Sequence, residues 1–321
     1  MMAEDRRIGI VGCGIIGASW ALAFARAGYR VQVWQRGDAP VLERIRRMAE
    51  AVEGTGSGLG PDDAERIIVD RDLARSLEGV CYVQESVVED LGQKRQMLVD
   101  VERHVSSDAI VASSTSAILP SVLAEGLASP QRFLVAHPLT PPHMLPLTEI
   151  CAAPQTSPEV LQAAVALLAD AGQSPVVLRR EIEGFVANRL LGALLNETFA
   201  LIGDGVIEPR DADVIFTAGF GLRWAIIGPL AAMDLNAPTG VRDYLTRYGS
   251  IFASIAQSRG TQVSLTPEVI DRVAASLANS SGLAPADRAA RRDHAIARIK
   301  DALTDEWRGS PEPDVPAAHS D

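Results

Sequence analysis

Apolar runs and a glycine-rich turn alternate at the start of the chain. Ile8–Val11 is an apolar run of strand length that leads into Gly12–Gly17. The small, apolar stretch 18–27 has the length of a helix, Gly28 ends it, and Val31–Trp34 is a second strand-like run. This pattern predicts strand, glycine turn, helix and strand within about thirty residues.

Strand-like runs alternate with helical segments up to about residue 180. The alternation predicts an α/β Rossmann-like, doubly wound and mostly parallel sheet over residues 1–183. Residues 39–66 look helical and polar, with an interruption at GTGSGLGP (54–61), which predicts a hairpin tip between two helices. The later strand-like runs are Cys81–Glu85, Ala109–Ser113, Phe133–Ala136, Leu147–Ala152 and Pro175–Leu178.

The strand signal disappears beyond Gly184, which predicts an all-α C-terminal domain over residues 184–307. Its expected helices are Phe185–Gly203, Pro209–Thr217, Pro229–Met233 and Thr239–Arg259. A helical half this rich in alanine and leucine predicts a homodimer that forms through this domain. The polar, proline-containing segment 308–321 is expected to be a disordered tail.

The glycine spacing of the first turn indicates a dinucleotide site. Gly12 permits a tight turn, Gly14 lets the backbone approach a pyrophosphate, and Gly17 lets the helix pack closely on the strand. With Ile15 and Ile16, these glycines are the expected NAD(P)-binding loop, because the following helix offers free N–H groups to phosphates. The alternative is a glycine-rich turn that binds no ligand.

Charge and composition exclude several classes of partner. The net charge is −11 and the isoelectric point is about 5.0, which argues against nucleic acid or an anionic membrane as the main partner. No run of eighteen uninterrupted apolar residues and no signal peptide are evident, and the three cysteines form no CxxC pair. The five histidines lack metal-ligand spacing. We therefore expect a cytoplasmic protein without a metal.

Four polar residues are candidates for the chemistry. Ser116 and His137 each follow or end a strand-like run, Glu149 lies in the next run, and Asn188 opens the long helix after Gly184. A strand-end histidine with a nearby carboxylate suits general base catalysis on a hydroxyl. A serine and an asparagine can hydrogen-bond the reacting oxygen.

Each candidate also fits a structural role. His137 can be a hydrogen-bonded structural residue, and the run that contains Ser116 can cap the following helix. Glu149 can be an ion-paired carboxylate, and Asn188 can be a helix N-cap. Spacing alone does not decide between these roles.

The chain resembles the 3-hydroxyacyl-CoA dehydrogenase superfamily from about Arg7 to about Ala302. Within it, the chain looks most like the branch of λ-crystallin and L-gulonate 3-dehydrogenase, to which L-carnitine dehydrogenase is related. The matching stretches are IVGCGIIGASWALAFARAGYRV, VQESVVEDLGQKR, ASSTSAILPS, VAHPLTPP, GFVANRL and GFGLRWAIIGPLAAMDLNAPTG.

The resemblance assigns roles to several residues. It implies that His137 is the catalytic base, that Glu149 orients it, and that Ser116 and Asn188 lie beside the substrate oxygen. It also implies that Glu89 and Lys94 line the cofactor near its ribose and nicotinamide. The implied reaction is NAD(P)-dependent oxidation of a 3-hydroxyl group.

The chain departs from the family pattern at two places. Gln35 stands where an acidic residue normally binds the adenosine ribose, and Arg36 follows it. The family implies NAD, whereas the lost carboxylate and the added cation favour the 2′-phosphate of NADP, and Asp38 is a possible substitute acid. Thr140 replaces an asparagine of the family pattern, which leaves the substrate open.

Arg223 is a candidate to bind a substrate carboxylate, or else it forms an ion pair at an interface. Three hypotheses for the activity follow: oxidation of a free 3-hydroxy acid, oxidation of a CoA thioester, and no catalysis. The arginines at 44, 46 and 47, without a lysine, weakly favour a free 3-hydroxy acid over a CoA thioester. In the third hypothesis the protein is non-catalytic and crystallin-like. The free-energy cost of burying four polar groups in one cleft argues against this hypothesis.

Overall fold

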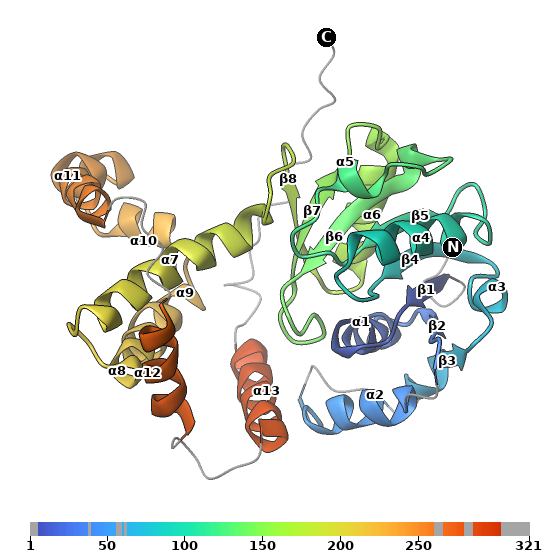
Figure 1. Ribbon diagram of the computed structural model, residues 1–321, viewed down its shortest axis with the longest axis horizontal. Coiled ribbons are helices and arrows are strands. Elements are labelled where there is room, and N and C mark those ends of the chain that lie inside the picture. The colour runs from blue at the N-terminus through green and yellow to red at the C-terminus, as the bar shows by residue number, and fades with distance from the viewer. Residues whose placement is uncertain are drawn as a thin grey trace. The chain divides into compact units, whose positions relative to one another are not determined.

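The computed structural model of the chain describes residues 6–37, 40–55, 60, 63–259, 266–278 and 285–302. Its internal contacts divide the chain into two compact units. The first unit comprises Met1–Asn188 together with Pro285–Asp321, and the second comprises Arg189–Ala284. All the strands among the described residues belong to the first unit (Figure 1).

In the described chain, eight strands form one sheet in the order β3-β2-β1-β4-β5-β6-β7-β8. Neighbouring strands are parallel except β6 and β7, which are antiparallel. The strand order reverses between β1 and β4, and ligands of such sheets bind at this switch point. The predicted doubly wound fold is confirmed. The strands are β1 (Arg7–Val11), β2 (Arg30–Trp34), β3 (Ile67–Asp70), β4 (Val80–Glu85), β5 (Ile110–Ser113), β6 (Phe133–Pro138), β7 (Leu147–Ala152) and β8 (Ser174–Leu178).

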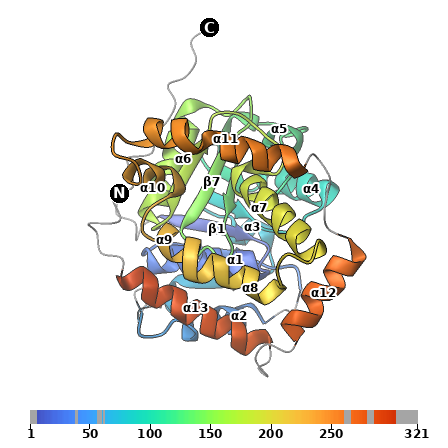
Figure 2. The ribbon, with the colours of Figure 1, turned by 90° about the vertical axis from the view of Figure 1, so that its left-hand side faces the viewer.

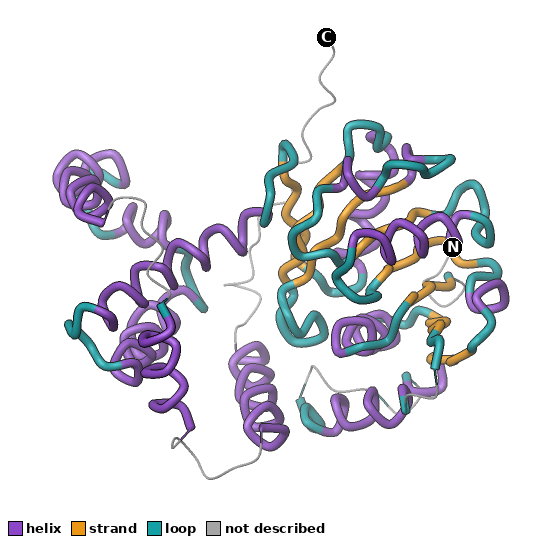
Figure 3. Tube along the Cα trace, viewed as in Figure 1, coloured by secondary structure: helices purple, strands orange, loops and turns teal. Residues whose placement is uncertain are grey.

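Helices cover both faces of the sheet (Figure 3). The strands are apolar on both sides because each face is buried, as is usual for parallel sheets. Trp20, Phe24, Tyr29 and Tyr82 form an aromatic cluster on one face. That face packs against α1 (Ile15–Arg26), α2 (Val41–Glu50) and α6 (Pro158–Asp170), and the other face packs against α3 (Leu73–Ser76), α4 (Leu91–Glu102) and α5 (Pro120–Leu123).

The segment 39–66 differs from the prediction of two helices. Among the described residues of this segment, α2 is the one α-helix, and it is followed by the short 3-10 helix η2 (Ala64–Arg66) and then by β3, which we did not predict. The run Ile67–Val69 extends the sheet because its backbone pairs with β2. The expected hairpin tip falls largely on 56–59 and 61–62, which lie outside the described residues.

Helices make up the described part of the second unit, in agreement with the predicted all-α C-terminal domain. The segment Ile215–Gly221 (η4) is a π-helix, a conformation that our prediction of one continuous helix over 209–217 did not include. The remaining helices are α7 (Phe185–Gly203), α8 (Pro209–Val214), α9 (Leu222–Trp224), α10 (Pro229–Leu235), α11 (Val241–Arg259), α12 (Pro267–Ala278) and α13 (Pro285–Ala302), with a 3-10 turn, η3 (Pro130–Arg132), before β6.

The last helix belongs with the sheet rather than with the other C-terminal helices. We expected residues 184–307 to form one domain, but the division falls at Asn188/Arg189, and α13 groups with the first unit. Ala297 of α13 is buried with Val52 and Met144, and Figure 2 shows α13 beside α2. The predicted tail 308–321 lies outside the described residues.

Helix α7 is unusually apolar for its exposure. By length and composition alone, α7 could cross a bilayer, and so could the bent pair Pro209–Trp224 and Pro229–Leu235. However, α7 contains Asn188, Arg189, Asn196 and Glu197. A helix at the core of a water-soluble protein passes the same test.

His143 anchors the loop between β6 and β7 to α1. It is fully buried, and the Ser19 hydroxyl lies 2.6 Å from its Nδ1 and accepts a hydrogen bond from its backbone N–H at 3.0 Å. Arg26 donates to its carbonyl at 3.0 Å. Burial lowers the pKa of His143 to about 4, and the charges of Arg26, Lys300 and Arg292 act in the same direction.

We predict that His143 makes the protein less stable in acid. The unfolded state binds a proton near the ordinary pKa of 6.5, whereas the native state stays neutral down to about pH 4. This contribution is complete above pH 6.5 and is lost as the pH falls toward 4, with a slope of at most about 1.4 kcal/mol per pH unit. Urea unfolding across this range should show a shallower pH dependence for His143→Asn than for the wild type. The exposed His104→Asn is the matched control, and equal slopes for all three proteins would contradict the assignment.

Candidate active site and nucleotide cavity

The glycine loop after β1 has the tight backbone that its spacing predicts. Gly12 has φ +89°, and a Cβ there would lie 2.9 Å from the backbone of Ser86 and Val87. A Cβ on Gly17 would lie 2.0 Å from the Gly12 carbonyl oxygen, so this position must be glycine for α1 to pack against the turn. A Cβ on Gly14 would meet nothing within 4 Å, so the backbone faces open space where a pyrophosphate could approach.

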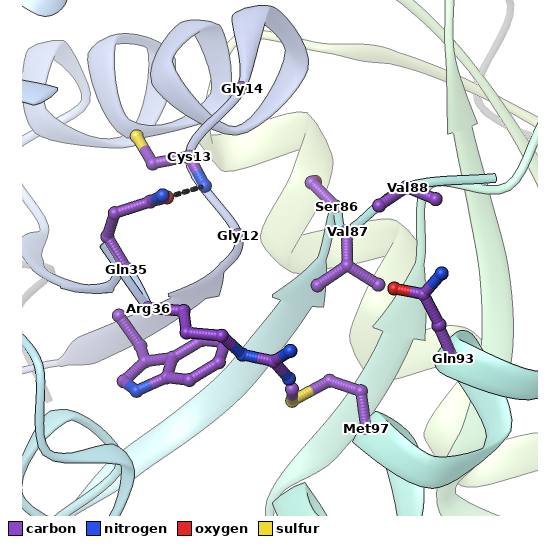
Figure 4. A pocket seen from close by; sticks show the side chains of 11 residues that line it. Gly12, Cys13, Gly14, Gln35, Arg36, Ser86, Val87, Val88, Gln93 and Met97 are labelled. Atoms are coloured by element: carbon purple, nitrogen blue, oxygen red, sulfur yellow. Dashed lines mark hydrogen bonds between the residues drawn. The ribbon is translucent and has the colours of Figure 1, made fainter. Parts of the chain in front are cut away.

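A cavity of about 440 Å³ opens beside this loop, at the switch point of the sheet (Figure 4). The glycine loop, the ends of β2 and β4, and α4 all contribute to its walls. Ile15, Ile16 and Gly17 are not among the described residues that line it: Ile15 is 64% exposed, and Ile16 packs on the core. The lining residues are Gly12, Cys13, Gly14, Trp34, Gln35, Arg36, Ser86, Val87, Val88, Gln93 and Met97.

The end of β2 presents an amide and a cation to the cavity. The Cys13 backbone N–H donates to Oε1 of Gln35 at 3.0 Å, so the amide oxygen binds the glycine loop without carrying a charge. The Arg36 guanidinium lies over the Trp34 ring, 5.8 Å from its centroid, and Figure 4 shows it extending across the cavity toward Met97. Asp38 lies outside the described residues.

Lys94 lies beneath the cavity wall and does not line the cavity. Its side chain is 1% exposed, and its ammonium donates to both carboxylate oxygens of Glu85, at 2.9 and 3.2 Å, and to the Val87 carbonyl at 3.3 Å. Glu85 is itself fully buried, so the two charges compensate each other. Lys94 therefore supports the cavity wall from behind, and its expected contact with the cofactor stays a prediction.

Glu89 connects Lys94 with Ser116. Its Oε2 lies 3.4 Å from the Lys94 ammonium, and its Oε1 accepts from the Thr115 hydroxyl at 2.5 Å and from the Ser116 N–H at 2.9 Å. Partial burial would raise the pKa of Glu89, but these hydrogen bonds and the Lys94 charge outweigh burial and lower it. Glu89 is thus a carboxylate that fixes the backbone at Ser116, and it too is outside the described cavity lining.

His137 and Glu149 form a buried pair. The antiparallel register of β6 and β7 places them directly opposite each other, and His137 Nδ1 lies 2.9 Å from Glu149 Oε2. Glu149 Oε1 accepts the backbone N–H groups of Val186 and Ala187, both at 2.9 Å, at the start of α7. A helix N-terminus favours a negative charge at this point.

These contacts fix the protonation pattern of the pair. Burial acts to raise the pKa of Glu149, but the hydrogen bonds from His137, Ala187 and Val186 prevail and lower it. An ionised Glu149 can only accept, so Nδ1 of His137 carries the hydrogen. In the neutral ring, Nε2 then has a free lone pair, as a general base requires.

The start of α7 is bent to reach Glu149. Gly184 and Phe185 have φ values of +74° and +48°, so two successive residues are left-handed. For Phe185 this conformation is strained. The Phe185 ring is fully buried, with its centroid 5.3 Å from that of His137. We did not single out Phe185 from the sequence, although the adjacent Gly184 signalled a turn.

The same helical turn reaches Ser116. Asn188 donates through Nδ2 to the Ser116 carbonyl at 2.8 Å. Ser116, Asn188, Glu149 and His137 are thus linked through the first turn of α7. Arg223 lies exposed on α9 in the second unit, and its substrate role stays a prediction.

Sequence reasoning missed the part of the cavity wall that follows β4. Ser86, Val87 and Val88 come directly after this strand, at the edge where parallel sheets bind ligands. That position was the available signal. Gln93 and Met97 face the cavity from α4, which begins at an N-cap where the Asp90 carboxylate accepts from the Gln93 N–H at 2.9 Å.

Comparisons with known proteins match the chain to one family along most of its length. Residues 7–182 match the model of the 3-hydroxyacyl-CoA dehydrogenase NAD binding domain, and residues 184–271 match that of the 3-hydroxyacyl-CoA dehydrogenase C-terminal domain. λ-Crystallin of Oryctolagus cuniculus is 36% identical, over 88% of this chain and 91% of its own length. L-Carnitine dehydrogenase of Bacillus cereus is 30% identical, over 95% of this chain and 94% of its own.

A solved structure gives the same result for the fold. It is that of 5-formyl-3-hydroxy-2-methylpyridine 4-carboxylic acid 5-dehydrogenase, described as an NAD⁺-dependent dismutase. It matches with a TM-score of 0.77 and 27% identity, over 93% of this chain and 98% of the other. The family models together span most of the two units, and the chain therefore belongs to the 3-hydroxyacyl-CoA dehydrogenase family.

Proposed function

We propose that this protein oxidises the 3-hydroxyl of a small, free hydroxy acid to the 3-keto acid, in the manner of an L-gulonate 3-dehydrogenase. The family contains NAD-dependent oxidoreductases that act on CH–OH groups. The observation that carries the proposal is the His137–Glu149 pair, whose Nδ1–Oε2 contact of 2.9 Å leaves Nε2 to act as a base.

The described residues fit a nicotinamide nucleotide. The open space at Gly14, the positive φ of Gly12 and the adjoining cavity together form a cradle for a pyrophosphate. Backbone N–H groups of the glycine loop would hold the phosphates, and Gln35 and Arg36 would face the adenosine end. When bound, the oxidised nucleotide accepts a hydride from the carbon that carries the hydroxyl.

Residues of this chain handle the proton. His137 Nε2 takes the hydroxyl proton as the carbonyl forms, and Glu149 stabilises the resulting imidazolium. The Ser116 hydroxyl and the Asn188 amide hydrogen-bond the substrate oxygen as its charge changes. The proton then passes from His137 to solvent, so the products are the keto acid, the reduced nucleotide and one proton.

The arginines of α2 support a free acid over a CoA thioester. Arg44 donates to the Cys13 carbonyl, and Arg47 pairs with Glu43 one helical turn away. Two of the three cations that could bind CoA phosphates are thus engaged within the protein. The short-chain thioester and L-carnitine remain alternative substrates of the same chemistry, and Arg223 is the proposed partner of a substrate carboxylate.

Exposed apolar side chains of the second unit support the proposed homodimer. Leu190, Leu230 and Leu235 are 68%, 71% and 75% exposed. Large apolar side chains that remain exposed on a domain favour an interaction site there. A second copy of this chain is the proposed occupant, because the helical domain would bury these side chains symmetrically.

We predict that His137→Ala lowers kcat by about 10²–10⁴-fold, because it removes the base. NADH binding should survive, since His137 is not among the cavity-lining residues. The assay follows the absorbance of the reduced nicotinamide with L-gulonate, L-carnitine, 3-hydroxybutyrate and 3-hydroxybutyryl-CoA. A variant that keeps most of its turnover would exclude His137 as the base. If the wild-type protein turns over only 3-hydroxybutyryl-CoA, the substrate is a CoA thioester and not a free acid.

We predict that the cofactor preference depends on Arg36. NAD is the cofactor expected from the family, and Arg36 with the uncharged Gln35 should also admit NADP. Arg36→Asp should lower kcat/KM for NADP by about tenfold or more relative to NAD, because it places a carboxylate against the 2′-phosphate. Arg46→Asp, outside the cavity lining, is the matched control. An unchanged ratio of kcat/KM for NADP to that for NAD would show that Arg36 does not contribute to the adenosine site.

We predict that the protein in solution has twice the 34.2 kDa mass of one chain. Light scattering coupled to gel filtration measures this mass directly. A mass of 34.2 kDa at micromolar concentration would contradict the homodimer.

A further inference from the structure

Ser86 is a polar residue of the cavity wall that the proposed function does not yet use. It follows β4, and its backbone N–H donates to the Val11 carbonyl at 2.7 Å. Gly12 packs against it so closely that a Cβ on Gly12 would lie 2.9 Å from its carbonyl carbon and oxygen. The Ser86 side chain therefore stands beside the glycine turn, as Figure 4 shows.

The orientation of the Gln84 amide is fixed by its partners. The Tyr82 hydroxyl donates to Gln84 Oε1 at 2.5 Å. The other end of the amide lies 3.1 Å from the Ala136 carbonyl, which can only accept, so this end is the NH₂ group. Its second hydrogen is directed to the Ser114 hydroxyl at 2.7 Å.

The Ser114 hydroxyl can therefore donate its hydrogen to only one of its neighbours. It accepts from Gln84 Nε2 and, at 3.2 Å, from the Trp20 indole N–H, which can only donate. With both lone pairs engaged, its own hydrogen points to the remaining neighbour, the Ser86 oxygen, at 2.9 Å. Ser86 accepts this bond, and its own hydrogen is left for a partner in the cavity that it lines.

We propose that Ser86 is a nucleotide-binding residue whose hydroxyl is held as a donor toward an oxygen of the bound dinucleotide, either on the pyrophosphate or on a ribose. This role rests on the cofactor binding proposed above. The hydrogen-bond donors behind Ser86 polarise its hydroxyl group. They also hold it in one orientation, so nucleotide binding does not cost the free energy of reorienting it.

Calorimetric binding of NADH, ADP-ribose and ADP to the full chain tests this role without any turnover. Ser86→Ala should weaken NADH and ADP-ribose binding by about tenfold, the usual effect of losing a hydrogen bond to a charged or strongly polar oxygen. Equal weakening of ADP binding would place the acceptor on the pyrophosphate or on the adenosine ribose, both of which ADP contains. Unchanged ADP binding would place it on the ribose that ADP lacks. The exposed Ser107→Ala is the matched control and should bind all three ligands as the wild type does.

A second variant tests the orientation of Ser86. Ser114→Ala removes the donor that fixes Ser86 but keeps the Ser86 hydroxyl, so it should weaken NADH binding by a smaller factor than Ser86→Ala. Wild-type affinity for NADH in Ser86→Ala would overturn the role of Ser86, and wild-type affinity in Ser114→Ala would overturn its fixed orientation. A wild-type protein that binds none of the three ligands would instead contradict the proposed cofactor.

Discussion

The Glu149 carboxylate is buried, and its two oxygens face different elements, so each needs hydrogen-bond donors there. Oε2 holds the His137 ring, and Oε1 holds the first N–H groups of α7. Removing the carboxylate would leave buried donors without partners on both sides, at a cost of about 1–3 kcal/mol for each unsatisfied group. The left-handed backbone at Phe185 is the local strain that accompanies this arrangement. Glu149 thus joins the catalytic ring to the helix that carries Asn188.

Beside the cavity, a network of buried and partly exposed polar side chains connects the nucleotide side with the catalytic side. Gln84 donates both to Ser114, behind Ser86, and to the carbonyl of Ala136, the residue before His137. The Lys94–Glu85 pair reaches Ser116 through Glu89. Such networks restrict their members to one geometry when every group has a partner. In the proposed reaction this rigidity keeps the base and the nucleotide in a fixed position relative to each other.

The sequence predicts the glycine loop from local pattern, whereas the link between His137 and Glu149 was implied by the family resemblance. A glycine turn between a strand and a helix needs no distant contact to be recognised, but His137 and Glu149 meet only through the antiparallel register of β6 and β7. Lys94 is similar, because its burial against Glu85 depends on how α4 packs on β4. The strand β3 and the packing of α13 were missed for the same reason: short or polar segments acquire their places only through tertiary contacts.

The central claim is that His137 and Glu149 act as one catalytic unit. The most direct test compares kcat/KM for His137→Ala, Glu149→Gln and the double variant with the same hydroxy acid and nucleotide. Because the amide of Glu149→Gln keeps an oxygen that can accept from the N–H groups of α7, its loss of activity comes through the imidazole, and adding it to His137→Ala should cause little further loss. If the two losses multiply in the double variant, the residues act independently, and the mechanism derived from their contact is wrong.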